Sequence, residues 1–160
     1  NSSDIAAKLW VCEINAPISN HDNTEGGYYL EWRPQYDHSE ITDDVLILSL
    51  NGAADLVYYD YITQTIRSTD GTNTVSIPIT LVADTKYRIG VAYGGGTMSV
   101  GVNGEWIDGV YDGAYTLGSR MDIFKASEGV NLYREVRGFQ VPYGTARTEI
   151  NTLMTLCANQ

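Results

Sequence analysis

The acidic side chains are the first candidates for chemistry in this sequence, because Asp and Glu together make up 20 of its 160 residues. A retaining glycoside hydrolase needs two carboxyl groups about 5 Å apart. Glu105 and Asp108 come nearest to such a pair, but their spacing places them on opposite faces of a strand. The other carboxylates are scattered through predicted turns. We therefore predict that the protein has no acid–base catalysis.

Two histidines are the next candidates, as metal ligands. His21 stands beside Asp22, and His38 stands near Asp37 and Glu40. A zinc site normally takes four ligands, and the two groups are far apart with no third histidine to join them. Solvated polar loops are the simpler interpretation of both groups.

Calcium is a better metal hypothesis than zinc. Asp43 and Asp44 are adjacent in a polar loop and offer the hard oxygen ligands that calcium prefers. Further oxygen donors of this kind in predicted loops are Asp22, Asn23, Asp70 and Asn73. Asp and Asn are also ordinary turn formers, and the EF-hand spacing is absent, so turn formation is the favoured interpretation.

Aromatic residues are the remaining candidates, and they indicate recognition. The sequence has 12 tyrosines and three tryptophans but only two phenylalanines. Sugar rings stack on aromatic faces while Asp and Asn bind the hydroxyls, and a protein interface uses the same residues. The candidates for glycan or partner binding are Trp32, Tyr58, Tyr59, Asp60, Tyr61, Tyr93 and Trp106. The sequence leaves both uses open.

Several classes of protein are excluded by motif and composition. There is no Gly-x-Ser-x-Gly motif, P-loop or dinucleotide fingerprint. The formal net charge of −10 argues against binding to nucleic acid or to an anionic bilayer. No apolar run is long enough for a transmembrane helix. The length fits one domain, which we assign to residues 1–160.

The segment Tyr87–Gly109 best defines the elements that must position these residues. Tyr87, Ile89, Val91 and Tyr93 alternate with smaller or polar residues, as in a half-buried strand. Three glycines at 94–96 allow the chain to reverse, and a second apolar alternation follows. The Asn-Gly pair at 103–104 predicts a two-residue hairpin turn.

Other strands and one helix are expected along the chain. Apolar or alternating runs predict strands at about 9–14, 28–33, 45–50, 56–67, 74–81, 120–125 and 132–142. Pro78 marks an edge or a bulge, because proline donates no ladder hydrogen bond. Residues 145–154 predict a short helix, with Thr145 as N-cap and Ile150, Leu153 and Met154 on one face.

The pattern of Tyr87–Gly109, with its two glycine turns and its Val-Asn-Gly sequence, resembles the concanavalin A-like, laminin-G-type sandwich. Over about Gly27–Leu156 the chain is most similar to lectin-like domains of bacteriophage virion proteins, such as tail fibres, spikes and capsid decorations. This resemblance implies an all-β fold, a two-sheet antiparallel jelly-roll sandwich with a short C-terminal helix. In that fold the first and last strands often lie side by side, so a Cys12–Cys157 bridge is an alternative to two separate buried thiols, which we favour.

The resemblance also implies a function. We expect a non-enzymatic binding domain on a virion surface, extracellular once the virion is released, that recognises a host-surface glycan. The alternative is a structural capsid decoration or fibre-assembly module that contacts other virion proteins, and a glycan hydrolase is a remote third hypothesis. Because the run 56–62 carries large side chains on both strand faces, we expect a homo-oligomer that covers the exposed aromatics. Fibres and spikes of the resembled family are commonly trimers, so a trimer is expected.

Overall fold

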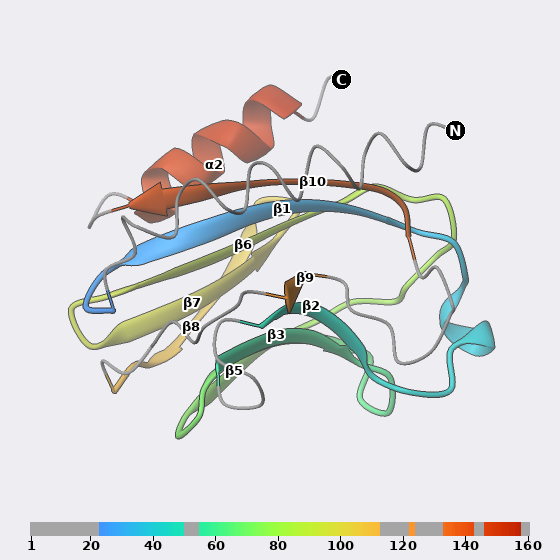
Figure 1. Ribbon diagram of the computed structural model, residues 1–160, viewed down its shortest axis with the longest axis horizontal. Coiled ribbons are helices and arrows are strands. Elements are labelled where there is room, and N and C mark those ends of the chain that lie inside the picture. The colour runs from blue at the N-terminus through green and yellow to red at the C-terminus, as the bar shows by residue number, and fades with distance from the viewer. Residues whose placement is uncertain (1–22, 50–54, 113–121, 124–132, 143–145, 158–160) are drawn as a thin grey trace.

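A computed structural model describes residues 23–49, 55–112, 122–123, 133–142 and 146–157. These residues form two antiparallel sheets of five strands each, stacked face to face (Figure 1). The first sheet has the order β10 (Tyr133–Pro142), β1 (Gly26–Pro34), β6 (Tyr87–Gly94), β7 (Thr97–Val102), β8 (Glu105–Val110). The second has the order β5 (Thr74–Pro78), β4 (Thr65–Asp70), β3 (Asp55–Asp60), β2 (Val45–Ser49), β9 (Asp122–Ile123). The expected all-β sandwich is confirmed.

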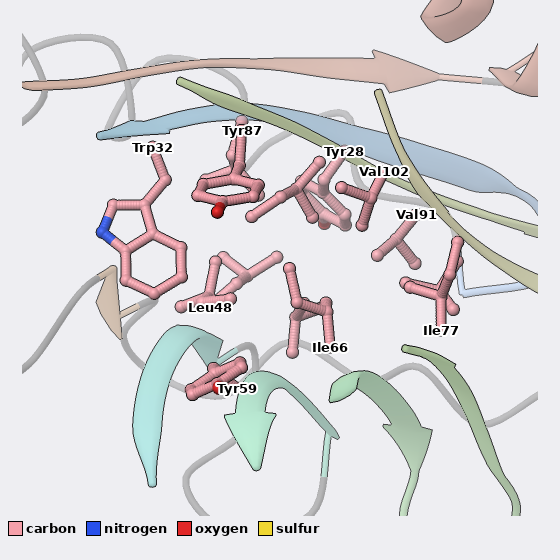
Figure 2. Close-up of a cluster of buried hydrophobic side chains, with 14 of the residues drawn as sticks. Tyr28, Trp32, Leu48, Tyr59, Ile66, Ile77, Tyr87, Val91 and Val102 are labelled. Carbon is pink, nitrogen blue, oxygen red and sulfur yellow. The ribbon is translucent and has the colours of Figure 1, made fainter. Parts of the chain in front are cut away.

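The main core lies between the two sheets and is filled from alternate strand positions (Figure 2). Tyr28, Leu30 and Trp32 of β1 point into it, as do the odd-numbered residues of β6 from Tyr87 to Tyr93. The Trp32 ring centroid lies 6.4 Å from that of Tyr59 in the second sheet and 6.3 Å from that of Tyr87. The alternation in the sequence therefore separated the two faces of both strands correctly, but it did not show which face is covered, since Trp32 and Tyr93 were expected at a binding surface.

The two glycine turns of the predicted central segment are also confirmed. Gly95 and Gly96, between β6 and β7, have φ angles of 58° and 79°. Asn103 and Gly104, between β7 and β8, have φ angles of 54° and 98°. Both central residues of a type I′ turn need positive φ, which Gly and Asn adopt at the lowest cost.

The prediction of a single strand from Leu56 to Arg67 is wrong. The structure has two strands, β3 and β4, joined by a turn at residues 61–64. The Asp60 carboxylate closes this turn by accepting the Thr63 amide at 2.9 Å, and Gln64 has a φ angle of 52°. The turn contains neither Gly nor Pro, so the usual sequence signal for a reversal was missing.

Three smaller expectations have mixed outcomes. β5 is an edge strand that ends at Pro78, as the proline predicted. The register of β2 shifts between Leu46 and Leu48, so Ile47 and Leu48 are both buried in the core. Of the strand predicted at 120–125, the described part is β9. The strand predicted at 9–14 and the cysteine bridge lie outside the described residues.

A helix, α2 (Ala146–Cys157), packs on the outer face of the first sheet and starts within one residue of the predicted position (Figure 1). Its Ile150 and Met154 are buried against Tyr29 and Ala92, which point away from the main core. The helix thus gives the first sheet a second, smaller core. None of the described helices is long and apolar enough to cross a membrane. A short 3-10 helix, η2 (His38–Glu40), follows β1.

Asp70, at the end of β4, organises the turn into β5 from a buried position. Its Oδ1 accepts the amides of Thr72 at 3.0 Å and Asn73 at 2.6 Å, and its Oδ2 accepts the amide of Asp112 at 3.0 Å. Burial alone would raise the pKa of Asp70, but the hydrogen bonds from Asn73, Asp112 and Thr72 outweigh it and hold the pKa below its ordinary value. This carboxylate ties the β4–β5 turn to the segment after β8.

Replacing Asp70 with asparagine is expected to lower the free energy of unfolding by about 1 to 3 kcal/mol at pH 7, because an amide cannot accept hydrogen bonds at both ends. The folded pKa lies below the unfolded value of about 3.9, so this stabilisation is fully present above the unfolded value and is lost as the pH falls below it and through the folded pKa. Urea unfolding measures the free energy of unfolding of wild type and of Asp70→Asn at pH 7 and near pH 3. The difference between the two proteins should be smaller at the lower pH. The exposed control Asp43→Asn should change stability by less than about 0.5 kcal/mol. A gap that is equal at both pH values would contradict the prediction.

Candidate functional site

The predicted aromatic surface is not a single surface, because three of its residues belong to the core. Trp32 and Tyr59 are 0% exposed and Tyr93 is 5% exposed. Side chains alternate between the two faces of a strand, and in each of these strands the face that carries the ring is directed at the opposite sheet. Trp32 and Tyr59 are therefore not accessible to a glycan or a partner in this structure, whereas Tyr93, although mostly buried, also lines the pocket described below. The trimer was predicted because an exposed aromatic patch would need to be covered, and Trp32, Tyr59 and Tyr93 do not belong to an exposed patch.

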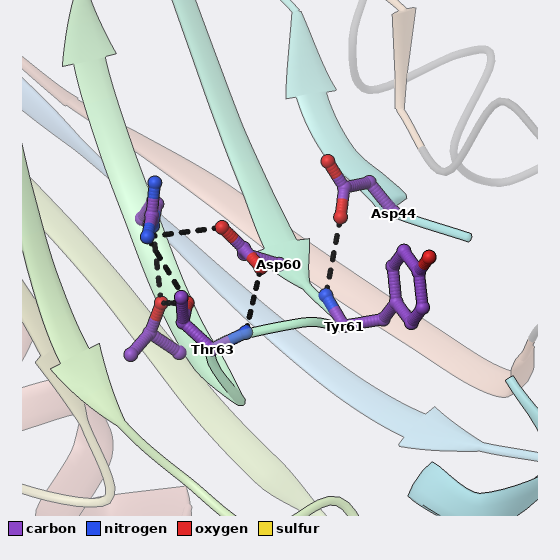
Figure 3. Close-up of polar contacts among 6 residues, drawn as sticks. Asp44, Asp60, Tyr61 and Thr63 are labelled. Carbon is purple, nitrogen blue, oxygen red and sulfur yellow. Dashed lines mark hydrogen bonds and ion pairs between the residues drawn. The ribbon is translucent and has the colours of Figure 1, made fainter. Parts of the chain in front are cut away.

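Tyr58 and Asp60 do face outward, on the second sheet. Tyr58 is half-buried and lies in register with Leu46 of β2 and Arg67 of β4. Asp60 forms an ion pair with Arg67 at 3.0 Å (Figure 3). The Thr63 amide, with Arg67 as a lesser cause, holds the pKa of Asp60 below its ordinary value. This outer face thus presents one tyrosine beside a charged pair whose members already bind each other.

Tyr61 and the two aspartates of the calcium hypothesis meet at the β3–β4 turn. The Tyr61 amide donates to Asp44 Oδ1 at 3.1 Å (Figure 3), and the Asp44 amide donates to Asp43 Oδ1 at 2.8 Å. Both carboxylates thus cap backbone groups. Within the described residues no three His, Cys, Asp or Glu side chains are grouped so that they could hold a metal ion. The geometry at Asp43 and Asp44 does not fit a calcium site.

His38 has a structural contact in place of the metal considered for it. Its Nδ1 lies 3.0 Å from the hydroxyl of Tyr59, and the two rings meet edge to face at 6.2 Å. The pair joins η2 to the second sheet. His21 lies outside the described residues.

Trp106 is the predicted candidate that packs against the C-terminal helix. It lies on the outer face of the first sheet, against the only helix of the described residues that packs there. A Cβ added at Gly101 would lie 2.5 Å from its Cδ2, and one added at Gly90 would lie 2.8 Å from its Cη2. The indole thus rests on two glycines, and its Nε1 donates to Asn151 Oδ1 at 2.6 Å.

Arg147, in the first turn of α2, connects Trp106 to two polar side chains. Its guanidinium lies 5.2 Å from the Trp106 ring centroid, and its Nη1 donates to Asp108 Oδ1 at 2.7 Å. The same oxygen accepts the Ser99 hydroxyl at 2.7 Å. The hydrogen bonds from Ser99 and Arg147 hold the pKa of Asp108 below its ordinary value. The arginine is therefore held in place from two sides.

Arg147 and Ser99 line a pocket with a volume of about 390 Å³. The pocket lies where the β6–β7 hairpin, the start of β1 and the first turn of α2 meet. Its lining residues are Glu25, Ala92, Tyr93, Gly94, Gly95, Thr97, Ser99 and Arg147. The lining combines a guanidinium group, a carboxylate and hydroxyls with the small residues Ala92, Gly94 and Gly95. This is the polar and apolar composition that a small-molecule pocket needs for orientation and contact.

Sequence reasoning missed every polar residue of this pocket. Glu25, Ser99 and Arg147 come from three separate segments, and none belongs to a recognisable motif. Tyr93 of the lining and Trp106, which contacts Arg147, were the two residues that sequence reasoning found, both by their aromatic type. Glu105 was considered as a partner of Asp108. Its side chain is on the same face of β8 as that of Ile107, and it pairs with Val102, whose side chain faces the core. Glu105 and Asp108 therefore lie on opposite faces of the strand, as predicted.

Comparison with known proteins identifies the fold. No family model and no curated protein matches the sequence. Several solved structures do match. One is the binding domain of botulinum neurotoxin serotype D, with a TM-score of 0.60 and 10% identity, where the match covers 83% of this chain and 37% of that one. A putative carbohydrate binding protein from Bacteroides ovatus also matches (TM-score 0.57, 14% identity, 82% and 41%). A third match is Trypanosoma rangeli sialidase in complex with 2,3-difluorosialic acid (TM-score 0.52, 17% identity, 82% and 23%).

These similarities show a concanavalin A-like, lectin-like sandwich, as the sequence resemblance implied. The chain spans about a quarter to two fifths of the length of these structures. At such low identity the likeness concerns the fold alone, so the pocket has to be judged on its own chemistry.

Proposed function

We propose that this chain is a non-enzymatic carbohydrate-binding domain and that the pocket beside Arg147 holds a sugar residue. The observation that carries the proposal is the convergence of Glu25, Ser99 and Arg147 on one concave site of about 390 Å³. A hydroxylated ligand needs closely spaced donors and acceptors of this kind. The floor of Ala92 and the hairpin glycines lets a ring approach the backbone.

The fixed position of Arg147 supports the proposal. Its contacts with Trp106 and Asp108 hold the guanidinium before a ligand arrives. A side chain that is already ordered loses less conformational entropy on binding, so more of the interaction energy appears as affinity. Such preorganisation is expected of a recognition site.

The solved structures of similar fold add support. One of them is described as a putative carbohydrate binding protein, and another contains a bound sialic acid derivative. The lectin-like fold is thus found in proteins that handle sugars. The whole activity of those longer proteins is not transferred to this chain.

Binding without catalysis is the second part of the proposal. A glycosidase acid needs a raised pKa so that it carries a proton at neutral pH. Asp108 is the acidic residue in direct contact with Arg147, and its pKa is lowered. It is suited to hold the arginine and unsuited to donate a proton.

Arg147→Gln is expected to weaken glycan binding by about tenfold or more, because a charge-assisted hydrogen bond to the ligand is removed. A glycan array followed by calorimetry on the best ligand measures this. The matched control is Arg67→Gln, which removes an arginine from the outer face of the second sheet and should leave affinity unchanged. If Arg67→Gln weakened binding and Arg147→Gln did not, the site would lie on the outer face of the second sheet. A wild-type chain that binds no glycan would overturn the proposal.

A second candidate function is assembly with other proteins through the outer face of the second sheet. Ile62, at the tip of the β3–β4 turn next to Tyr61, is 75% exposed, and Tyr58 lies on the same sheet. The expected trimer and the position on a phage virion remain proposals, and the virion rests on the sequence resemblance. Light scattering that shows a monomer at high micromolar concentration would contradict assembly of this chain with itself.

A further inference from the structure

Resting on the proposed glycan-binding function, we infer that the pocket selects an uncharged sugar residue and discriminates against sugars that carry a carboxylate. The inference comes from the hydrogen-bonding roles and charges of the residues around the pocket. A single arginine in a pocket is often the partner of a ligand carboxylate. Here the surroundings of Arg147 favour the opposite preference.

The charge of Arg147 already has a partner. Its Nη1 lies 2.7 Å from Asp108 Oδ1, and its guanidinium carbon lies over the Trp106 ring, 5.2 Å from the ring centroid. A ligand carboxylate that approached the guanidinium would therefore meet the carboxylate of Asp108 as well. The two like charges would repel each other, which weakens the attraction of the site for an anionic ligand.

A second carboxylate increases this repulsion. Glu25 lines the pocket directly. Arg147 is the one basic residue of the lining. The formal charges of Glu25, Asp108 and Arg147 sum to −1 for the pocket and its immediate contacts. The chain as a whole carries −10, so its overall field also opposes an anionic ligand.

The hydrogen-bonding roles point the same way. The Ser99 hydroxyl donates its proton to Asp108, so towards the pocket its oxygen can only accept. Glu25 also only accepts when it is ionised. These acceptors suit a ligand rich in hydroxyl groups, which donate and accept. The carboxylate group of an acidic sugar accepts only, so wherever it faces Glu25 or Ser99 that acceptor is left without a donor.

The experiment compares sugars that differ only in charge. Methyl galactoside and methyl galacturonide, and the matching glucoside and glucuronide, are titrated into the protein and followed by chemical shifts of the pocket residues. The neutral member of each pair is expected to bind about ten to a hundred times more tightly, and the ratio should shrink as salt screens the repulsion. Lactosamine and its sialylated form on an array extend the test to larger glycans.

Variants separate selectivity from binding. Glu25→Gln is expected to narrow the preference for the neutral sugar, because it removes one repelling charge from the lining. Glu105→Gln is the charge-matched control: it removes an exposed carboxylate at the other end of β8, and the preference should remain. An acidic sugar that binds as tightly as its neutral partner, or more tightly, would overturn the selectivity and leave glycan binding intact. Failure of both members of every pair to bind would overturn both proposals.

Discussion

Trp32→Ala is expected to lower the free energy of unfolding by about 3 to 5 kcal/mol, which is the usual cost of emptying a buried aromatic site. The indole is fully buried and lies between Tyr59 of one sheet and Tyr87 of the other. Its removal leaves a cavity between two rigid layers that cannot collapse to fill it. Natural domains of this size are stable by only about 5 to 15 kcal/mol, so the loss is a large share of the total.

Chemical denaturation with urea measures this difference. Tyr58→Ala is the control, because it removes an aromatic ring from the outer face of the neighbouring sheet and is expected to cost less than about 1 kcal/mol. If Trp32→Ala does not fold, the milder Trp32→Phe should still fold with a reduced midpoint. Equal effects of Trp32→Ala and Tyr58→Ala would contradict the placement of Trp32 between the sheets.

Gly101→Ala is expected to destabilise the protein by about 1 to 3 kcal/mol although it adds a single methyl group. The new Cβ would lie 2.5 Å from Cδ2 and 2.6 Å from Cε2 of Trp106. These atoms are at the centre of the indole, so the ring cannot avoid the methyl group by turning one end. It must lift from β7, and its contacts with Asn151 and Arg147 are disturbed with it.

A double-mutant cycle with Trp106→Leu tests whether the indole is the cause. The Gly101→Ala change should cost much less in the Trp106→Leu background, with a coupling of about 1 kcal/mol or more. Calorimetry on the same variants should show weaker glycan binding for Gly101→Ala, because Arg147 contacts the Trp106 ring that the methyl group displaces. Additive effects in the cycle would show that the methyl group acts elsewhere.

The loss of the predicted aromatic surface has a general cause. A run such as residues 56–62 shows by its alternation that a strand has two faces. Both faces of β3 carry a tyrosine, Tyr58 on one and Tyr59 on the other. Which of them is covered depends on the side on which the other sheet lies. That information is carried by long-range packing and is absent from the local sequence.

The sequence by itself determined most of the strands, the division of each into two faces, and most of the turns. Alternation with period two separated the two sides of β6, and glycine or Asn-Gly pairs at 94–96 and 103–104 marked reversals, because these are local consequences of backbone geometry. The apolar spacing of Ile150 and Met154 likewise predicted the helix and its buried face. The exception was the turn at 61–64, where a side-chain cap from Asp60 replaces the glycine that would have revealed it.

Only the tertiary structure decided where the candidate site lies. Glu25, Ser99 and Arg147 are far apart in the sequence, and the β6–β7 hairpin, the start of β1 and the docked helix bring them together. The helix docks there because Gly90 and Gly101 leave room for the Trp106 indole and for Ile150 and Met154. Judged from the local sequence alone, a glycine within a strand is expected to destabilise that strand. Here the absence of a Cβ makes room for side chains from distant parts of the chain, which pack over the glycines.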